Sequence, residues 1–178
     1  MAHIILVTGG ARSGKSDYAQ QQAEALSGPR CFVATCSVHD NEMIERIERH
    51  RKARKEADWH TIEEPYELEK VFSVDKGYKT YLVDCLTLWI SNIYEKSSQQ
   101  GAVLEEDDIE KHVRKLFRMI REKNFTVLLV TNEVGMGIVP ENAIARKYRD
   151  LVGRCNRVCA QLANEVVLVS VGLPLRLK

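Results

Sequence analysis

The residues with the clearest chemical meaning lie near the start of the chain, in a glycine-rich run that ends on a lysine and a serine. Residues 9–16 fit the spacing G-x-x-x-x-G-K-[ST] of a phosphate-binding loop, between an apolar strand-like run and a helical pattern. In such a loop, successive backbone N–H groups and the start of the following helix attract phosphate oxygens. Lys15 would reach the β- and γ-phosphates, and Ser16 would bind Mg²⁺. The spacing predicts nucleotide binding without distinguishing ATP from GTP. The predicted contacts are Gly9, Gly10, Ala11, Arg12, Ser13, Gly14, Lys15 and Ser16.

Two carboxylates are candidate partners for this loop. Asp84 ends the apolar run 81–83, as the acidic residue of a Walker B strand does, and we predict that it binds the metal together with Ser16. The alternative for Asp84 is a helix N-cap directly after a strand. Glu133 follows the apolar run 125–130 and could position a metal, a hydroxyl or a water. The alternative for Glu133 is an ordinary polar residue at a strand end.

His50 differs from the other histidines because arginines surround it. With Arg49, Arg51 and Arg54 nearby, a positive field would lower the pKa of the imidazole and keep a ring nitrogen available for attack. A neutral nucleophile beside cations that bind phosphates is what covalent nucleotidyl transfer requires. However, residues 42–56 also contain Glu–Arg and Glu–Lys pairs four positions apart, which are typical of a solvent-exposed helix. The residues alone leave both interpretations open.

Short apolar runs alternate with longer segments of helical periodicity along the whole chain. Strands that are apolar throughout are buried on both faces, which is typical of parallel sheets. The pattern predicts an α/β fold, with residues 1–178 forming a single three-layer P-loop NTPase domain of RecA-like type around a mostly parallel sheet. Strands are predicted at 3–7, 31–34, 61–62, 81–84, 125–130 and 166–171. Helices are predicted at 17–26, 40–57, 65–77, 86–94, 105–123 and 141–162, with a polar loop at 97–101.

The composition excludes several other classes of protein. Lys and Arg number 26 against 25 Asp and Glu, so the formal net charge of +1 lacks the basic excess of most nucleic-acid binders. The longest stretch without a charged residue, 1–11, is too short for a membrane span, and the N-terminus lacks the features of a signal peptide. We therefore expect a cytoplasmic protein that binds neither nucleic acid nor membrane. The five cysteines show no paired spacing and indicate neither a disulfide framework nor a zinc site.

Four runs together resemble the bifunctional adenosylcobinamide kinase / adenosylcobinamide-phosphate guanylyltransferase family of cobalamin biosynthesis. These runs are the phosphate loop at 8–16, Arg-Ile-Glu-Arg-His-Arg at 46–51, the long Asn-Glu-Val-Gly run at 130–142, and Arg-Asp-Leu-Val-Gly-Arg-Cys-Asn at 149–156. They occur in the order of the family. Many families share the phosphate loop, whereas the Asn-Glu-Val-Gly run is specific.

The resemblance implies two reactions in one chain. ATP or GTP phosphorylates the aminopropanol hydroxyl of adenosylcobinamide, and GTP then transfers GMP to adenosylcobinamide phosphate through a GMP–histidine intermediate, for which His50 is the matching residue. The resemblance also implies a homotrimer with sites between subunits. Besides the phosphate loop, it implies nucleotide contacts at Ala34, Thr35, Cys36, Arg51, Lys52, Ala53, Arg54, Glu63 and Asp84.

The chain departs from the family pattern beside the predicted nucleophile, because Arg49 stands where some relatives carry a second histidine. This departure leaves one histidine to react, and it can alter how the nucleotide is positioned. Cys36 and the pair 52–53 also look variable, so we expect any contacts there to use the backbone. Two other functions stay open, namely a P-loop small-molecule kinase without nucleotidyl transfer and a non-enzymatic RecA-like nucleotide-binding module.

Overall fold

A mostly parallel sheet forms the centre of the protein, as the sequence predicts. The computed structural model describes residues 1–36 and 58–178. In this part of the chain the strand order is β3-β2-β4-β5-β1-β6-β7, and every pairing is parallel except that of β6 with β7. The strands are β1 His3–Gly9, β2 Arg30–Ala34, β3 Trp59–Glu63, β4 Thr80–Asp84, β5 Thr126–Asn132, β6 Glu165–Ser170 and β7 Leu173–Arg176.

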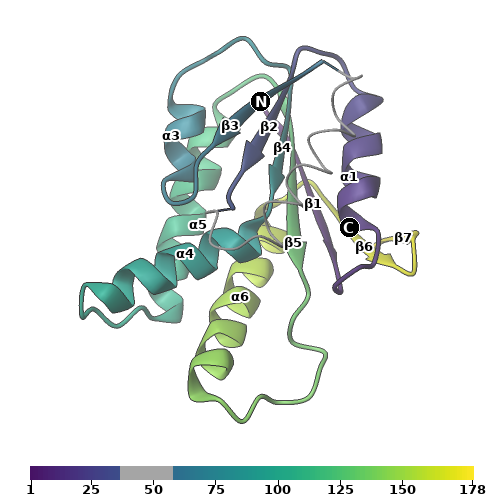
Figure 1. The fold of residues 1–178 in the computed structure, drawn as a ribbon. Coiled ribbons are helices and arrows are strands. Elements are labelled where there is room, and N and C mark those ends of the chain that lie inside the picture. The colour runs from purple at the N-terminus through teal and green to yellow at the C-terminus, as the bar shows by residue number, and fades with distance from the viewer. Residues whose placement is uncertain (37–57) are drawn as a thin grey trace.

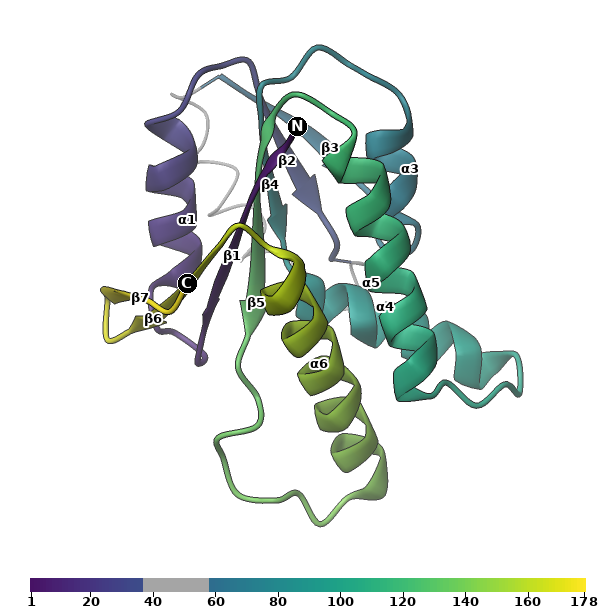
Figure 2. The ribbon, with the colours of Figure 1, turned by 180° about the vertical axis from the view of Figure 1, so that it is seen from behind.

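Helices cover both faces of this sheet, so the domain has three layers. Figures 1 and 2 show α1 on one face and α3, α4, α5 and α6 on the other. The helices are α1 Lys15–Glu24, α3 Leu68–Ser73, α4 Leu86–Gln99, α5 Glu106–Arg121 and α6 Ala143–Leu162. Within the described segments, no helix combines the length and the apolar composition that a bilayer crossing requires.

Alternation along the strands divides the buried side chains between two cores. On the side of α3–α6, Leu6 and Leu129 pack in a large cluster that includes Trp89. On the side of α1, the cluster is smaller, and the small side chains of Ala19 and Ala23 let the helix approach the sheet closely. Consecutive residues of one strand therefore point into different cores. This alternation decides the side of the sheet on which each strand-end residue lies.

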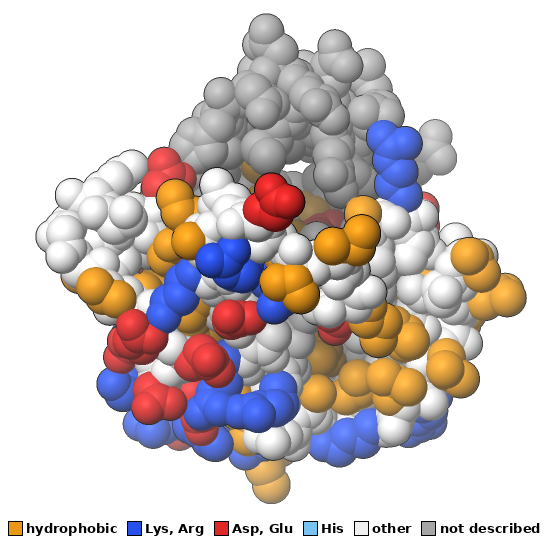
Figure 3. Space-filling view, turned by 90° about the horizontal axis from the view of Figure 1, so that it is seen from below, with side chains coloured by type: hydrophobic (Ala, Val, Ile, Leu, Met, Phe, Trp, Pro, Cys, Tyr) orange, Lys and Arg blue, Asp and Glu red, His pale blue; other side chains and the backbone are white. Residues whose placement is uncertain are grey.

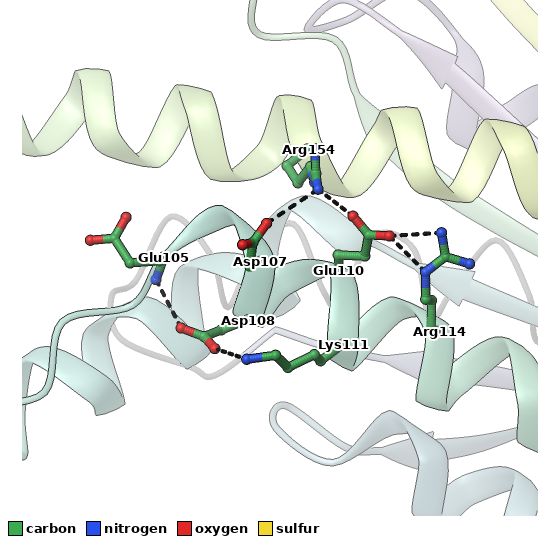
Figure 4. A network of polar contacts seen from close by, with 7 residues as sticks. All are labelled: Glu105, Asp107, Asp108, Glu110, Lys111, Arg114 and Arg154. Carbon is green, nitrogen blue, oxygen red and sulfur yellow. Dashed lines mark hydrogen bonds and ion pairs between the residues drawn. The ribbon is translucent and has the colours of Figure 1, made fainter.

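Charged side chains join α5 to α6, and most of them come from the first turns of α5. At the start of α5, one carboxylate oxygen of Asp108 accepts a hydrogen bond from the Glu105 N–H at 3.2 Å. Arg154 of α6 contacts Asp107 Oδ1 at 3.3 Å and also pairs with Glu110 (Figure 4). Acids in the first turn of a helix also complement its dipole. Arg154 thereby holds the middle of α6 against the start of α5.

The predicted strands and helices of the described segments are confirmed, but most of their boundaries shift by one to five residues, and the helix predicted at 65–77 spans only Leu68–Ser73. Pro65 does not start a helix. The Glu64 carboxylate accepts hydrogen bonds from the backbone N–H groups of Tyr66 and Glu67 and forms a bend before α3 begins at Leu68. The predicted loop 97–101 is also partly wrong, since α4 continues to Gln99. Sequence patterns missed β7, a short exposed strand. The predicted helix 40–57 lies entirely outside the described residues.

Candidate functional site

The phosphate loop joins the end of β1 to the start of α1 in a shape that needs its glycines. Gly14 has φ +89°, a left-handed conformation that disfavours other residues. A Cβ at Gly9 would lie 2.3 Å from the Val169 carbonyl oxygen, so β6 leaves no room for a side chain there. Lys15 is 7% exposed and folds back over the loop, with its Nζ donating a hydrogen bond to the Gly10 carbonyl oxygen at 3.2 Å. The lysine that would meet phosphates thus lies over the loop.

Neighbouring segments hold this loop from two sides. The Gly172 N–H, in the turn between β6 and β7, donates to the Ser13 carbonyl oxygen at 2.9 Å. The Glu133 N–H, just beyond β5, donates to the Gly9 carbonyl oxygen, also at 2.9 Å. Because these contacts come from the protein itself, they help to hold the phosphate loop in this shape. Such preorganisation favours anion binding.

The strand register brings the predicted acidic partner to the same edge of the sheet. Asp84 ends β4 and pairs with Ala34 of β2, which pairs in turn with Glu63 of β3. Carboxyl ends of parallel strands are where α/β sheets bind ligands. Asp84 is two positions beyond Leu82, which packs in the core beside α1, so its side chain points to the side of the phosphate helix. Figure 3 looks onto this edge, where charged side chains gather toward one side and hydrophobic ones toward the other.

The pKa of the buried Cys85 thiol depends on the charges around it. Burial raises the pKa of Cys85 to about 11, with a further increase from the charge of Asp84 and a decrease from the charge of Lys15. Both charged groups therefore act on the same buried atom. The acidic residue and the phosphate-loop lysine lie on a common side of the sheet, as a nucleotide site of this type requires.

Thr35 has a structural role at this edge. Its hydroxyl donates to the Cys85 carbonyl oxygen at 2.7 Å and accepts from the Cys85 N–H at 2.8 Å. Its carbonyl oxygen accepts a hydrogen bond from the Asn92 amide of α4 at 2.7 Å. Thr35 therefore joins the end of β2 to the residue after Asp84 and helps to fix the position of that carboxylate.

A polar network lies at the end of β5 and was not predicted from the sequence. The Asn132 N–H donates to the Thr87 hydroxyl at 2.7 Å, and the Asn156 amide donates to the Asn132 carbonyl oxygen at 2.9 Å. Asn132 Oδ1 is buried and makes no hydrogen bond in the described part of the chain. Since β5 lies between the strands that carry the phosphate loop and Asp84, Asn132 lies at the centre of the site. Its position directly after an apolar run was the available signal.

Comparison with known proteins identifies the family. The model of the cobinamide kinase / cobinamide phosphate guanyltransferase family matches residues 5–177. The chain belongs to this family. The resemblance found in the sequence is therefore confirmed.

Relatives within the cobinamide kinase / guanyltransferase family match nearly end to end. The bifunctional adenosylcobalamin biosynthesis protein CobU of Escherichia coli K12 is 38% identical over 185 residues, covering 98% of this chain and 99% of the relative. The CobU protein of Salmonella typhimurium shows the same identity and coverage. The corresponding CobP protein of Pseudomonas aeruginosa is 36% identical over 174 residues, covering 97% and 96%.

The fold has a wider likeness outside the family. The crystal structure of a KaiC-like protein from Pyrococcus horikoshii OT3 matches with a TM-score of 0.55 and 20% identity, covering 93% of this chain and 71% of the other. At this identity the likeness concerns the fold alone. It confirms the RecA-like α/β architecture predicted from the sequence.

The structure places one part of the predicted nucleotide site and leaves the other part undescribed. The phosphate loop, Ala34, Thr35, Cys36, Glu63 and Asp84 meet at the carboxyl edge of the sheet. His50 and the contacts predicted at 51–54 lie outside the described residues. The nucleotide contacts and the nucleophile of this family member therefore stay predictions.

Proposed function

We propose that this chain phosphorylates the aminopropanol hydroxyl of adenosylcobinamide with ATP or GTP, and then transfers GMP from GTP to the new phosphate through His50. Family membership supports both reactions. The observation that carries the proposal is the preformed phosphate loop with Lys15 folded over it, on the same side of the sheet as Asp84. We further propose that the protein acts in the cytoplasm as a homotrimer.

In the kinase step, the substrate hydroxyl attacks the γ-phosphorus and the bond to the β–γ bridging oxygen breaks, releasing the nucleoside diphosphate. Lys15 and the loop N–H groups stabilise the charge on the phosphates. The hydroxyl proton passes to a carboxylate, for which Asp84 and Glu133 are the two candidates. Glu133 Oε1 accepts a hydrogen bond from the Gly135 N–H at 2.6 Å, which orients the carboxylate, and its second oxygen could take the proton.

In the transferase step, a ring nitrogen of His50 attacks the α-phosphorus of GTP, and the bond to the α–β bridging oxygen breaks to release pyrophosphate. A phosphate oxygen of adenosylcobinamide phosphate then attacks the same phosphorus and displaces the imidazole. Lys15, Arg51 and Arg54 supply positive charge for the departing pyrophosphate. Using one phosphate loop for both nucleotides explains how a single chain of this size performs two reactions.

The donor set at the site fits Mg²⁺. The Ser16 hydroxyl at the start of α1 and the Asp84 carboxylate are both hard oxygen ligands on the phosphate side of the sheet. No group of three or more His, Cys, Asp or Glu side chains in the described segments could hold a metal. Mg²⁺ suits such a site because it commonly takes one or two carboxylates together with nucleotide phosphates and water. When bound, it would neutralise phosphate charge.

Product analysis by mass spectrometry tests the proposal. The wild-type protein, given adenosylcobinamide, GTP and Mg²⁺, should form the phosphate and then adenosyl-GDP-cobinamide. His50→Ala should stop at the phosphate, whereas His60→Ala, a histidine of β3, should form both products. If wild-type protein forms only the phosphate, the chain is a small-molecule kinase. If it forms neither product, the proposed function is wrong.

A further inference from the structure

An open hollow of about 510 Å³ lies between the segment that follows β5 and the side of α6. The segment lines it with Gly135, Gly137 and Val139, and α6 with Arg149, Gly153 and Arg157. Most of these residues belong to the runs 130–142 and 149–156, which carry the family resemblance, and none of the lining residues belongs to the phosphate loop. Figures 1 and 2 show the segment extending away from the sheet and returning into α6. The fold thus brings two separate family motifs to one hollow.

The segment that lines the hollow is hydrogen-bonded to the phosphate edge. Glu133 connects the two, because its N–H donates to the Gly9 carbonyl oxygen at 2.9 Å and its carboxylate accepts from the Gly135 N–H at 2.6 Å. From α6, the Asn156 amide donates to the Asn132 carbonyl oxygen at 2.9 Å. A substrate in the hollow could therefore extend a flexible arm toward the phosphate loop.

The charges around the hollow favour a ligand with many neutral polar groups. Arg149 and Arg157 provide N–H donors, while Glu106 and Asp150 provide carboxylate acceptors in the same lining, and Arg149 Nε also pairs with Asp150 Oδ1 at 3.6 Å. The remaining arginine of the lining, Arg154, is occupied by acids of α5 (Figure 4). Mixed donors and acceptors match carboxamides, which both donate and accept, better than they match a polyanion.

Apolar side chains are exposed on the segment that lines the hollow. Met136 is 83% exposed and Ile138 is 97% exposed, and Val139 contributes to the lining itself. Neighbouring large apolar side chains that are exposed to solvent are typical of binding sites. Together with the polar lining, they suit a ligand that has an apolar ring and a polar periphery.

Gly153 indicates that a ligand approaches α6 closely. It lies in the interior of α6, where glycine weakens a helix relative to alanine. A Cβ at this position would meet no atom within 4 Å, and its φ is not in the left-handed range. Neither packing within the described chain nor backbone conformation therefore requires glycine here. A bare helix surface facing the hollow lets a broad, flat group lie directly against it.

From these observations we infer that the hollow binds the corrin ring of the cobinamide substrate, with the ring edge against Gly153 and its side-chain amides on Arg149, Arg157 and Asp150. This inference rests on the proposed function, which makes cobinamide the acceptor. The ring is an apolar macrocycle bordered by carboxamides, and the arm that bears the reacting hydroxyl would extend past Glu133 to the phosphate loop. The hollow accommodates one side of the ring.

Filling the hollow tests the inference. Gly153→Leu places a side chain in open space, and the helix should tolerate it because leucine is a good helix former. We expect KM for adenosylcobinamide in the kinase step to rise at least about tenfold, with the dissociation constant for GTP unchanged. Gln161→Leu is the matched control, since it adds a leucine to an exposed position of α6 outside the hollow. Equilibrium dialysis with adenosylcobinamide, without nucleotide, should show the same loss of affinity for Gly153→Leu alone.

Three results would overturn the inference. The first is an unchanged KM for adenosylcobinamide in Gly153→Leu. The second is an equal loss of GTP affinity, which would mean general damage to the site. The third is a change of molecular mass in solution, which would assign the hollow to contacts between copies of the chain. In each case wild-type activity shows that the proposed function still holds; inactive wild-type protein would instead refute that function.

Discussion

The two faces of the central sheet differ in what they bury and in what they do. On the side of α3–α6, strand residues such as Leu129 join a broad apolar core under Trp89 and Phe117. On the side of α1, the apolar core is smaller, and β4 and β5 end at the same edge as the phosphate loop in Asp84 and Asn132. One face supplies most of the buried apolar surface and the other carries the proposed nucleotide site. Substitutions on the two faces should therefore have separable effects.

The largest expected effect comes from Lys15 on the chemical face. Lys15→Ala removes the ammonium group that meets the phosphates, so kcat/KM for both reactions should fall about 10²- to 10³-fold. The free energy of unfolding should change by about 1 kcal/mol, because the substitution removes the hydrogen bond from Nζ to the Gly10 carbonyl oxygen. Steady-state kinetics and urea unfolding measure the two quantities, with exposed Lys96→Ala as the control. A variant with wild-type kinetics would remove the phosphate loop from the mechanism.

On the opposite face, a truncation should lower stability and leave the chemistry intact. Leu129 is fully buried, and Leu129→Ala should lower the free energy of unfolding by about 2–5 kcal/mol. KM for GTP should keep its wild-type value at a temperature where the variant is folded. Val103→Ala, at a position that is 76% exposed, should change stability by less than about 0.5 kcal/mol. If Leu129→Ala weakens GTP binding as much as it lowers stability, the two faces are not separable.

Thiol reactivity tests the boundary between the core and the edge. Cys85 is buried with its pKa raised to about 11, whereas Cys36 is only partly buried at the nucleotide edge. At pH 8, alkylation by iodoacetamide should modify Cys36 at least about tenfold faster than Cys85, because the thiolate is the reacting form. GTP should slow modification of Cys36, as peptide mass spectrometry would show. Equal protection of buried Cys155 would indicate general tightening of the protein instead.

The smallest effect concerns the exposed ion pairs of α5. The side-chain hydrogen bond from Arg114, followed by the charge of Arg154, lowers the pKa of Glu110. A carboxyl with a depressed pKa stabilises the fold above its unfolded pKa of about 4.3, and this stabilisation disappears as pH falls through the lower folded value. Arg114→Met should therefore lower Tm slightly at pH 6 and converge with wild type near about pH 3. Arg118→Met, on the same helix, should show no such convergence.

Local patterns in the sequence were sufficient for most of the fold. Most strands could be predicted because they are continuously apolar, and the phosphate loop because its glycines and lysine are close together in the chain. By contrast, β7 is short and exposed, and it pairs only because Val171 and Gly172 take positive φ values in the preceding turn. The helix α4 extends through a polar stretch that reads as a loop.

The candidate site shows the same limit more sharply. Asp84 could be predicted from its position after an apolar run, but the structural role of Thr35 depends on Cys85, fifty positions away along the chain. The hollow beside α6 joins runs that are separated in the sequence, and its lining is defined only when the segment returns beside the helix. Features that depend on contacts between distant residues could not be predicted from spacing.

The central claim is that the chain transfers GMP through His50 with the phosphate loop that also serves the kinase step. Incubation with GTP labelled at the α-phosphate and Mg²⁺, without any corrinoid, tests it most directly. We predict a protein adduct that is labile to acid and stable to alkali, on the peptide that contains His50, and absent from both His50→Ala and Lys15→Ala. Absence of label from the wild-type protein, or label that persists in His50→Ala, would contradict the account.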